Sequence, residues 1–386
     1  MSNMIEYEKL KNIASYPTGK LNSNAADENG KYPFFTCAHE IYKINSYSYD
    51  GEYVLLGGNN ANGDFPVFYF NGKFDAYQRT YLISSKNPNY ETKYLYYAIQ
   101  LKLKQMQKNA SGTATKYLTL PILNSINIEK FDYDDQLKLI NILEKYDLLI
   151  ENNNKRIKIL EQMAEELYKE WFVRFRYPGY EKYKRKDGIP GDWKVSKIGD
   201  VCEVIGGGTP STKIDEYWDG DIPWITPADL AKHEIPRVFK GERNITDLAI
   251  NKSGAKLLKK NTIILSSRAP IGYVAISSTE MCTNQGCKNL ECDDNLINYY
   301  YLFMWLKNNK DLLNSYGSGA TFLELSIKSL SKIKLLLPSI KLQNQFGGCF
   351  EKIDAEITNL ALQNENLINQ RDLLLPRLMS GKLEIE

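Results

Sequence analysis

An internal repeat constrains the fold of this chain more than any other feature of its sequence. Over a long stretch the two halves align without a gap at an offset of 207 residues, which places Gln136 on Gln343 and Asp147 on Asp354. The same offset places SGTATKYLTL on SGATFLELSI, and it falls to 190 where YPFFT matches IPWIT. Loop insertions of different length produce such a change of offset. The chain is therefore a tandem duplication of two similar units.

Each half begins with a mixed region of short strands and ends with a long helix. In the first mixed region EYVLLGG and FPVFYF predict strands, and in the second NTIILSS and YVAIS do, because turn residues bound each apolar run. The first long helix follows Asp132 and Asp134, either of which can cap it, and contains no Pro or Gly up to Phe172. The second is expected from about Gln343 to Met379. Three residues weaken its ends: Gly347, Gly348 and Pro376.

Both helices carry a coiled-coil seam in alternating steps of four and three residues. The first seam is Leu139, Leu143, Tyr146, Ile150, Asn153, Ile157, Leu160, Ala164, Leu167 and Trp171. The repeat gives the second as Phe346, Phe350, Ile353, Ile357, Leu360, Asn364, Leu367, Arg371, Leu374 and Leu378. A seam confined to these positions needs a helical partner, whereas two unrelated surface helices would not.

The polar seam residues predict an antiparallel pairing of the two helices. If the helices are aligned about their common centre, Asn153 faces Asn364 and the two buried amides can hydrogen-bond to each other. The same alignment sets Arg371 opposite Tyr146, where the guanidinium can lie on the ring face. A parallel pairing would set each Asn against an apolar residue.

Length and composition leave several function classes open. A chain of 386 residues favours two or three domains, and a formal net charge of +2 neither supports nor excludes nucleic-acid binding. No stretch approaches the roughly 18 apolar residues of a membrane span, and MSNMIEYEKL lacks the apolar core of a signal peptide. We therefore expect a cytoplasmic protein.

No motif predicts catalysis or a metal site. There is no phosphate-binding G-x-x-x-x-G-K-[ST] element and no H-E-x-x-H zinc pair. Cysteines recur five residues apart without a nearby His, and we expect free thiols at Cys282, Cys287 and Cys292. The two histidines, His39 and His233, lie at non-equivalent positions of the repeat, so we expect each to have a local role.

Two segments resemble cofactor motifs but have simpler explanations. Residues 87–90, Asn-Pro-Asn-Tyr, resemble the loop with which amino-methyltransferases hold an extruded adenine, but Asn89 replaces the second Pro. No glycine-rich strand-to-helix turn precedes them, so we expect a turn before the helix LYYAIQLKLKQM. Gly206, Gly207 and Gly208 lack a following helix N-terminus, and we expect a flexible turn leading to Thr209 rather than a phosphate site.

Three segments carry a family resemblance. KEWFVRFRYPGYE follows the first long helix, DGIPGDWKVSKIGDV opens the second half, and LLPRLMSGKLEI lies near the C-terminus. In this order, together with the duplication, they resemble the signature segments of Type I restriction-modification specificity subunits over nearly the whole chain. The resemblance implies two target-recognition domains alternating with two antiparallel helices, each domain contacting one half of a split DNA site.

The resemblance also implies partners and cofactors. Two modification subunits would bind S-adenosylmethionine and methylate adenine, and restriction subunits would cut DNA using ATP and Mg²⁺. This chain would then hold no cofactor and catalyse nothing. The expected fold is α/β, mixed α+β, with a pseudo-two-fold repeat. The expected parts are target-recognition domain 1 at 1–133, a spacer helix at 134–176, a linker at 177–192, target-recognition domain 2 at 193–337, and a second spacer helix with the C-terminal tail at 338–386.

Loops rich in Lys, Arg and small polar residues are the candidates for contacts with double-stranded DNA, because such side chains bind phosphates and base edges. In the first half these are Thr18, Lys20, Asn59, Asn60, Gln78, Arg79 and Lys116. In the second half they are Thr209, Ser211, Thr212, Lys213, Asp229, Lys232, Arg268, Gln285 and Lys288. Any one of them can equally be a solvated surface side chain. The basic run at 182–186 is interpreted as a solvated linker that adds at most phosphate attraction.

Two other functions remain open on sequence grounds: a self-contained methyltransferase, which the missing cofactor motifs disfavour, and a coiled-coil adaptor whose globular domains bind protein. Adjacent methyltransferase and nuclease genes would favour the specificity function over the adaptor. For that function the repeat predicts a split DNA site. The seam from Leu139 to Trp171 covers 32 residue steps, or roughly 48 Å at the helical rise, which suggests specific blocks about one turn of DNA apart or slightly more.

Overall fold

The computed structural model describes residues 6–61, 63–110, 115–182, 184–186, 188–233, 235–268, 270–319 and 323–381. The chain divides into two compact units, unit 1 with residues 1–151 and 365–386, and unit 2 with residues 152–364. Each long helix therefore begins in one unit and ends in the other. Residues 111–114 and 320–322, which belong to the repeated SGTATKYLTL and SGATFLELSI segments, lie outside the described residues.

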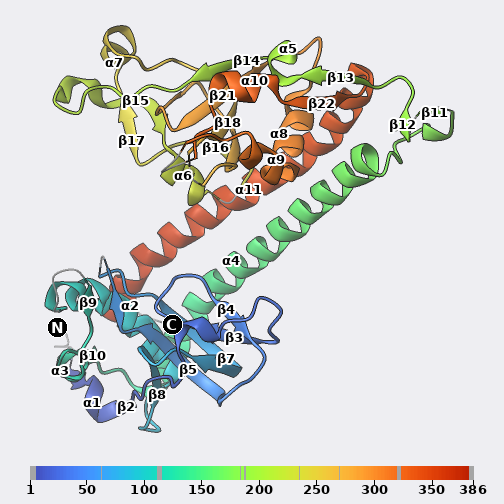
Figure 1. Cartoon of the computed structure of the whole chain (residues 1–386). Coiled ribbons are helices and arrows are strands. Elements are labelled where there is room, and N and C mark those ends of the chain that lie inside the picture. The colour runs from blue at the N-terminus through green and yellow to red at the C-terminus, as the bar shows by residue number, and fades with distance from the viewer. Residues whose placement is uncertain are drawn as a thin grey trace. The chain divides into compact units, whose positions relative to one another are not determined.

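Unit 1 is built on a six-stranded sheet of order β2-β8-β5-β7-β3-β4. Helix α2 packs against β5, β7 and β8 and buries Tyr94, Leu95, Ala98 and Ile99, which share one helical face (Figure 1). Its elements are β1 (Tyr7–Lys9), α1 (Leu10–Ile13), β2 (Ala14–Ser15), η1 (Ser23–Ala25), β3 (Tyr32–Phe35), β4 (Tyr42–Ile44), β5 (Tyr49–Gly57), β6 (Asn59–Asn60), β7 (Val67–Ala76), β8 (Thr80–Ser85), α2 (Thr92–Asn109), β9 (Lys116–Tyr117), α3 (Leu120–Ser125) and β10 (Asn127–Glu129).

Unit 2 has a five-stranded sheet of order β14-β21-β18-β19-β16 and a three-stranded sheet of order β17-β15-β20. Its strands are β11 (Arg185–Lys186), β12 (Ile189–Pro190), β13 (Lys194–Lys197), β14 (Cys202–Gly206), β15 (Trp218–Ile225), β16 (Arg237–Val238), β17 (Arg243–Ile245), β18 (Ile263–Ser266), β19 (Val274–Ser277), β20 (Cys282–Thr283), β21 (Cys287–Cys292) and β22 (Lys334–Leu337). Its short helices are η3 (Tyr180–Lys182), α5 (Ile198–Val201), η4 (Asp215–Tyr217), α6 (Pro227–Ala231), α7 (Asp247–Lys252), α8 (Tyr299–Asn308), α9 (Lys310–Ser315) and α10 (Ile327–Lys332).

The two units share one strand order, as the sequence repeat predicts. The order β2-β8-β5-β7 in unit 1 corresponds to β14-β21-β18-β19 in unit 2, and the pair β1-β10 corresponds to β13-β22. The four strands predicted from apolar runs are confirmed as β5, β7, β18 and β19, and the predicted helix after residues 87–90 is α2. Those residues form the expected turn, in which Tyr90 N donates to Asn87 O at 3.0 Å.

Both long helices are confirmed. The first, α4 (Tyr133–Tyr168), continues as a π-helical segment, η2 (Lys169–Val173). The second, α11 (Ile340–Met379), includes Gly347, Gly348 and Pro376 without a break. Gly347 packs closely on Asn298 inside α11, where a Cβ would lie 2.7 Å from the Asn298 side chain. Close packing on the globular part of unit 2, rather than helix termination, explains this glycine.

The predicted antiparallel register holds where it is observed within unit 2. Asn153 Nδ2 donates to Asn364 Oδ1 at 3.0 Å, and both residues are buried. The same alignment opposes Trp171 and Phe346, whose ring centroids lie 6.0 Å apart. None of the twenty predicted seam residues is exposed. The amide pair therefore satisfies itself inside an otherwise largely apolar seam.

Within unit 1 the predicted contact of Arg371 with the Tyr146 ring is replaced by an ion pair. Arg371 Nη1 donates to Asp147 Oδ1 at 2.7 Å, so the guanidinium binds the residue that follows Tyr146 in the sequence. A carboxylate gives a half-buried guanidinium a charge-assisted hydrogen bond, which is stronger than attraction to a ring face.

The aligned glutamines Gln136 and Gln343 fix the start of each long helix in the same way. Gln136 Oε1 accepts from Glu91 N at 3.1 Å, and its Nε2 donates to Asn89 O at 2.8 Å and to Phe131 O at 3.0 Å. Gln343 makes the same three bonds to residues that lie 207 positions further along: Asn298 N at 2.9 Å, Leu296 O at 3.3 Å and Pro338 O at 2.9 Å.

Candidate nucleic-acid interface

In unit 1 the predicted residues gather around one exposed β-turn between β7 and β8. Thr80 N donates to Tyr77 O at 2.8 Å and closes the turn, which has Gln78 and Arg79 at its two central positions. Gln78 is exposed, and its Nε2 donates to Asn22 Oδ1 at 3.1 Å. The turn therefore presents an amide side chain that a neighbouring amide already orients.

The segment carrying Thr18 and Lys20 lies against this turn because of a glycine between them. A Cβ on Gly19 would lie 2.2 Å from Ala76 O, so no other residue allows the approach. Gly19 N donates to Thr80 O at 3.0 Å, and Lys20 is exposed beside it.

The remaining predicted residues of unit 1 lie on the small ladder β6-β9 beside the turn. Asn59 pairs with Tyr117, and Asn60 with Lys116. Gly58 N donates to Arg79 O at 2.8 Å, and the Arg79 guanidinium lies 5.4 Å from the centroid of the Tyr117 ring. All seven candidates of the first half thus form one surface, here called the turn-1 surface: Thr18, Lys20, Asn59, Asn60, Gln78, Arg79 and Lys116.

Unit 2 has a corresponding turn around Gln285. Cys287 N donates to Asn284 O at 3.1 Å, and Gln285 Oε1 accepts a hydrogen bond from Thr209 Oγ1. Gly207 packs on this turn, since a Cβ there would lie 2.0 Å from Asn284 O. The expected turn is wrong at Gly206, which is the last residue of β14, while Gly207 and Gly208 pack closely against neighbouring main-chain carbonyls.

An ionic cluster supports the Gln285 turn. Lys288 is buried, and its Nζ lies 3.1 Å from Ser267 Oγ, 3.2 Å from Gln285 O and 3.4 Å from Glu324 Oε1. Arg268 Nε lies 3.3 Å from Glu324 Oε2. Lys288 was selected from the sequence as a DNA contact, but its ammonium is directed at the turn. Arg268 and Gln285 remain exposed.

The other predicted residues of unit 2 have diverse roles. Ser211, Thr212 and Lys213 are exposed in the loop after Thr209. The carboxylate of Asp229 accepts from Thr226 N at 2.8 Å, Thr226 Oγ1 at 2.6 Å and Glu242 N at 2.9 Å, so it caps α6. Lys232 is exposed at the end of that helix. We name the turn-2 surface by its exposed residues: Thr209, Ser211, Thr212, Lys213, Arg268 and Gln285.

The two surfaces stand on the same backbone frame. In addition to the two turn bonds, three matched pairs of hydrogen bonds connect the turns to their units: Tyr77 N to Phe35 O at 2.9 Å and Asn284 N to Ile225 O at 2.9 Å; Gly58 N to Arg79 O at 2.8 Å and Ser267 N to Gly286 O at 2.8 Å; Leu118 N to Gly58 O at 2.8 Å and Leu325 N to Ser267 O at 2.8 Å. This frame makes Asn59 equivalent to Arg268, and Tyr117 equivalent to Glu324.

Sequence reasoning missed three residues of these surfaces: Asn22, Tyr117 and Glu324. Asn22 lies where the repeat offset changes, so no constant offset relates it to Thr209. Tyr117 and Glu324 correspond at the constant offset of 207, but their unlike side chains give no sign that both belong to these surfaces. The matched hydrogen bonds of Leu118 and Leu325 show it.

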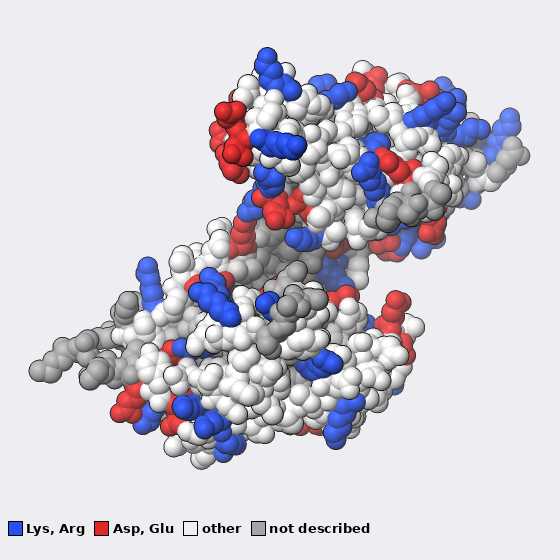
Figure 2. All heavy atoms as spheres, turned by 60° about the vertical axis from the view of Figure 1, so that its left-hand side comes forward, with Lys and Arg blue, Asp and Glu red and all other residues white. Residues whose placement is uncertain are grey.

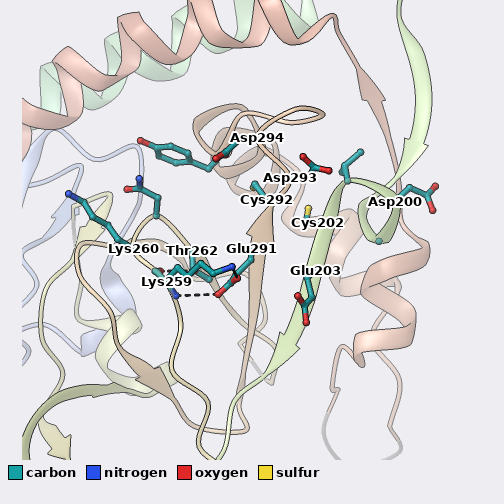
Figure 3. Close-up of a pocket in the computed structure, with 14 residues that line it drawn as sticks. Asp200, Cys202, Glu203, Lys259, Lys260, Thr262, Glu291, Cys292, Asp293 and Asp294 are labelled. Atoms are coloured by element: carbon teal, nitrogen blue, oxygen red, sulfur yellow. Dashed lines mark hydrogen bonds and ion pairs between the residues drawn. The ribbon is translucent and has the colours of Figure 1, made fainter. Parts of the chain in front are cut away.

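A cavity of about 600 Å³ elsewhere in unit 2 is a poor site for DNA (Figure 3). Two lysines, Lys259 and Lys260, face more carboxylates than they can neutralise, and Lys259 Nζ already lies 2.8 Å from Glu291 Oε2. The carboxylates are Asp200, Glu203, Glu291, Asp293 and Asp294. Such a lining repels phosphate. Cys202 and Cys292 face each other across β14 and β21 beside it, and their contact, together with burial, raises the pKa of the Cys292 thiol.

Charge is mixed over the face shown in Figure 2, where Lys and Arg alternate with Asp and Glu. Affinity for DNA would thus rest on local cations. Among the described residues, no group of three or more His, Cys, Asp and Glu side chains could hold a metal ion. Both histidines have local partners: His39 Nε2 lies 2.8 Å from Asp64 Oδ2, and His233 Nε2 lies 2.7 Å from Arg237 O. No described helix is long and apolar enough to cross a membrane.

Comparison with known proteins identifies relatives over nearly the whole chain. The family model of the Type I restriction modification DNA specificity domain matches residues 4–162 and 190–370. The MjaIX specificity subunit of Methanocaldococcus jannaschii is 43% identical over 199 residues, which are 51% of this chain and 46% of that one. The EcoDI specificity subunit of Escherichia coli is 24% identical over 97% of this chain and 88% of its own length.

A solved structure supports the fold. The crystal structure of the S subunit of a Type I restriction-modification system from M. genitalium matches 97% of this chain and 96% of that one, with a TM-score of 0.61 and 16% identity. At this identity the likeness concerns the fold alone, namely two mixed α/β parts together with long helices.

Proposed function

Because the chain belongs to the Type I restriction modification DNA specificity family, we propose that its two units each recognise one half of a bipartite DNA site. The chain is a DNA specificity component and not an enzyme. In the proposed complex it positions two modification subunits, which methylate adenine with S-adenosylmethionine, and restriction subunits that use ATP and Mg²⁺. It would act in the cytoplasm, where these partners meet DNA.

The observation that carries this proposal is the pair of surfaces on one backbone frame. Turn 1 and turn 2 have the same hydrogen-bonded scaffold, yet their exposed side chains differ at almost every position except the central glutamine. A duplicated scaffold with different side chains is suited to recognising two different short sequences. Catalytic duplication would instead preserve the reactive side chains.

The turn-1 and turn-2 surfaces combine the two kinds of contact that sequence-specific binding needs. Lys20, Lys116 and Lys213 are long cations that can reach phosphates and supply affinity. Short amides and hydroxyls beside them can contact base edges and supply specificity. Asp229 and Lys288 make internal bonds within unit 2, and Lys232, exposed at the end of α6, stays a predicted DNA contact.

Mapping methylated adenines across the host genome tests the bipartite site. We expect two short specific blocks separated by a non-specific spacer, and one continuous block would contradict the proposal. An exchange of residues 193–337 for the equivalent part of a relative should change one block and leave the other intact. If both blocks change, the two units do not recognise DNA independently.

A protein-binding adaptor is the competing function, and the same chain can decide between them. Purified with its modification subunits, the chain should confer sequence-specific methylation on duplex DNA. Modification subunits that methylate the same sites without the chain would show that it contributes no DNA specificity.

A further inference from the structure

We propose that Gln78 and Gln285 are matched specificity-determining residues, and that each contacts an adenine in the half-site of its own unit. This inference rests on the proposed function, since it assigns the base contact within each surface. Both residues occupy the first central position of a four-residue turn, Tyr77–Thr80 in unit 1 and Asn284–Cys287 in unit 2. Both side chains are exposed.

Each turn packs closely on a glycine beneath it. Gly19 and Gly207 donate their N–H groups to Thr80 O at 3.0 Å and Cys287 O at 3.4 Å, which are equivalent residues of the repeat. A Cβ on either glycine would lie within 2.4 Å of the carbonyl oxygen that precedes the glutamine. A base-contacting side chain gains precision from a backbone that cannot yield in this way.

Each glutamine also has a partner that orients its amide. Asn22 binds the Gln78 amide and Thr209 binds the Gln285 amide, and both partners follow the segment that packs on the turn. A side chain fixed before binding loses less rotamer entropy when it meets a base. Asn22 and Thr209 are therefore positioning residues in this proposal, and the glutamines make the contact.

The chemistry left on each amide fits adenine. With Nε2 donating one hydrogen to Asn22, Gln78 keeps one N–H donor and its acceptor oxygen. With Oε1 accepting one hydrogen from Thr209, Gln285 keeps both N–H donors and a second lone pair. Adenine presents an acceptor, N7, next to a donor, N6, in the major groove, and a glutamine amide binds both at once. Guanine presents two acceptors there and leaves the amide oxygen unpaired.

The residues around Gln78 differ from those around Gln285, so the glutamine is what the two turns share. Arg79 beside Gln78 lies over the Tyr117 ring, whereas the main-chain oxygen of Gln285 accepts a hydrogen bond from the buried ammonium of Lys288. Among the described residues of both turns, only the glutamine and its oriented amide recur at the same place. The shared residue is thus expected to make the shared kind of contact, and the surrounding residues to distinguish the two half-sites.

The test uses the full chain assembled with its modification subunits and duplexes carrying the mapped methylation site. Each A·T pair of the site is replaced singly by G·C, and methylation rates are measured for the wild-type chain, Gln78→Ala and Gln285→Ala. We expect each variant to lose discrimination at one A·T pair, by roughly tenfold to a hundredfold, and only in one half-site. Gln105→Ala, which removes an exposed glutamine of α2, is the matched control and should change nothing.

Two further variants separate contact from positioning. Asn22→Ala and Thr209→Val keep the glutamines but free their amides, so discrimination at the same A·T pairs should fall by less than in the glutamine variants. Equal weakening on every duplex would assign the glutamines to phosphate and overturn the inference. Unchanged discrimination in both glutamine variants would overturn it too, while the bipartite function stands if the wild-type chain still directs methylation to a split site.

Discussion

Units 1 and 2 share a backbone frame but stabilise it with different chemistry. Around Gln78 the neighbours are an amide and an arginine stacked on a tyrosine ring, whereas around Gln285 they form an ionic cluster of Arg268, Lys288 and Glu324. The hydrogen bonds between main-chain groups stay the same in both units. Duplication therefore preserved the scaffold, and the side chains diverged where a ligand would be recognised.

The same divergence occurs at the aligned carboxylates on the two long helices. Asp147 is paired within unit 1 by Arg371, which lies on α11. Asp354 is paired within unit 2 by Arg237 of β16, whose Nε lies 2.5 Å from Oδ2, and by the Tyr300 hydroxyl at 2.8 Å. Burial alone would lower the pKa of Arg237, but Asp354 and Tyr300 outweigh it and raise that pKa. The guanidinium is thus held charged against a carboxylate that is almost completely buried.

The largest expected effect comes from breaking this buried pair. Arg237→Ala leaves the Asp354 carboxylate, 1% exposed, without its counter-ion, which should cost about 3 to 5 kcal/mol of unfolding free energy. Arg371→Ala leaves Asp147, whose side chain is 26% exposed, without its counter-ion. Since water can solvate this carboxylate, the loss of unfolding free energy should be about 1 to 2 kcal/mol.

Urea unfolding at fixed salt measures both losses. Arg156→Ala is the control, because its pair with Glu356 is exposed on both sides and should contribute less than about 1 kcal/mol. Equal losses for the Arg237 and Arg371 variants would show that burial does not distinguish the two carboxylates.

The sequence predicted the elements that follow from periodicity. The repeat, both long helices, the strands β5, β7, β18 and β19, and the Asn153–Asn364 contact all follow from apolar spacing and the position of polar seam residues. The Asp147–Arg371 pair did not follow, because Asp147 lies beside the seam and heptad spacing carries no information on flanking charges. Periodicity also gave no sign that Gly347 is a packing residue.

A second comparison concerns the aligned glutamines at the start of the long helices. Gln136 and Gln343 are fully buried, and each side chain makes three hydrogen bonds to main-chain groups. Gln136→Ala and Gln343→Ala each remove these three bonds. Each unsatisfied buried group costs roughly 1 to 3 kcal/mol. The two losses should be equal, and limited proteolysis should show opening in the mutated unit alone. A loss confined to one variant would mean that only one helix depends on this junction.

The sequence indicated residue types for the candidate site but not their arrangement. The seven candidates of unit 1 lie together on the turn-1 surface, although Asn59, Asn60 and Lys116 lie on strands β6 and β9 and not in loops. Asp229 and Lys288 had the right residue type but are engaged in a helix cap and a buried ionic cluster. The sequence does not show which polar side chains already use their hydrogen-bonding groups within the protein.

The smallest expected effect compares Arg268 with Asn59, which occupy the same place in the two frames. Arg268 is exposed, and its Nε lies 3.3 Å from Oε2 of the anionic Glu324. If it contacts a base, Arg268→Ala should weaken DNA binding by about 1 to 2 kcal/mol and relax one position of the unit 2 half-site. The value lies in the lower part of the usual range because Glu324 already neutralises part of the charge.

Asn59→Ala should have a weaker effect, below about 1 kcal/mol, since an uncharged side chain adds no phosphate attraction. The buried Oδ1 of Asn59 has no hydrogen-bond partner among the described residues. Alanine therefore removes the proposed DNA contact and, with it, a buried oxygen whose desolvation nothing compensates. Titrations of labelled duplex at two salt concentrations separate the possibilities. Weakening of Arg268→Ala that is uniform across sequences and comes with a smaller salt slope would identify a phosphate contact, and the two equivalent positions would then differ in kind of contact as well as in charge.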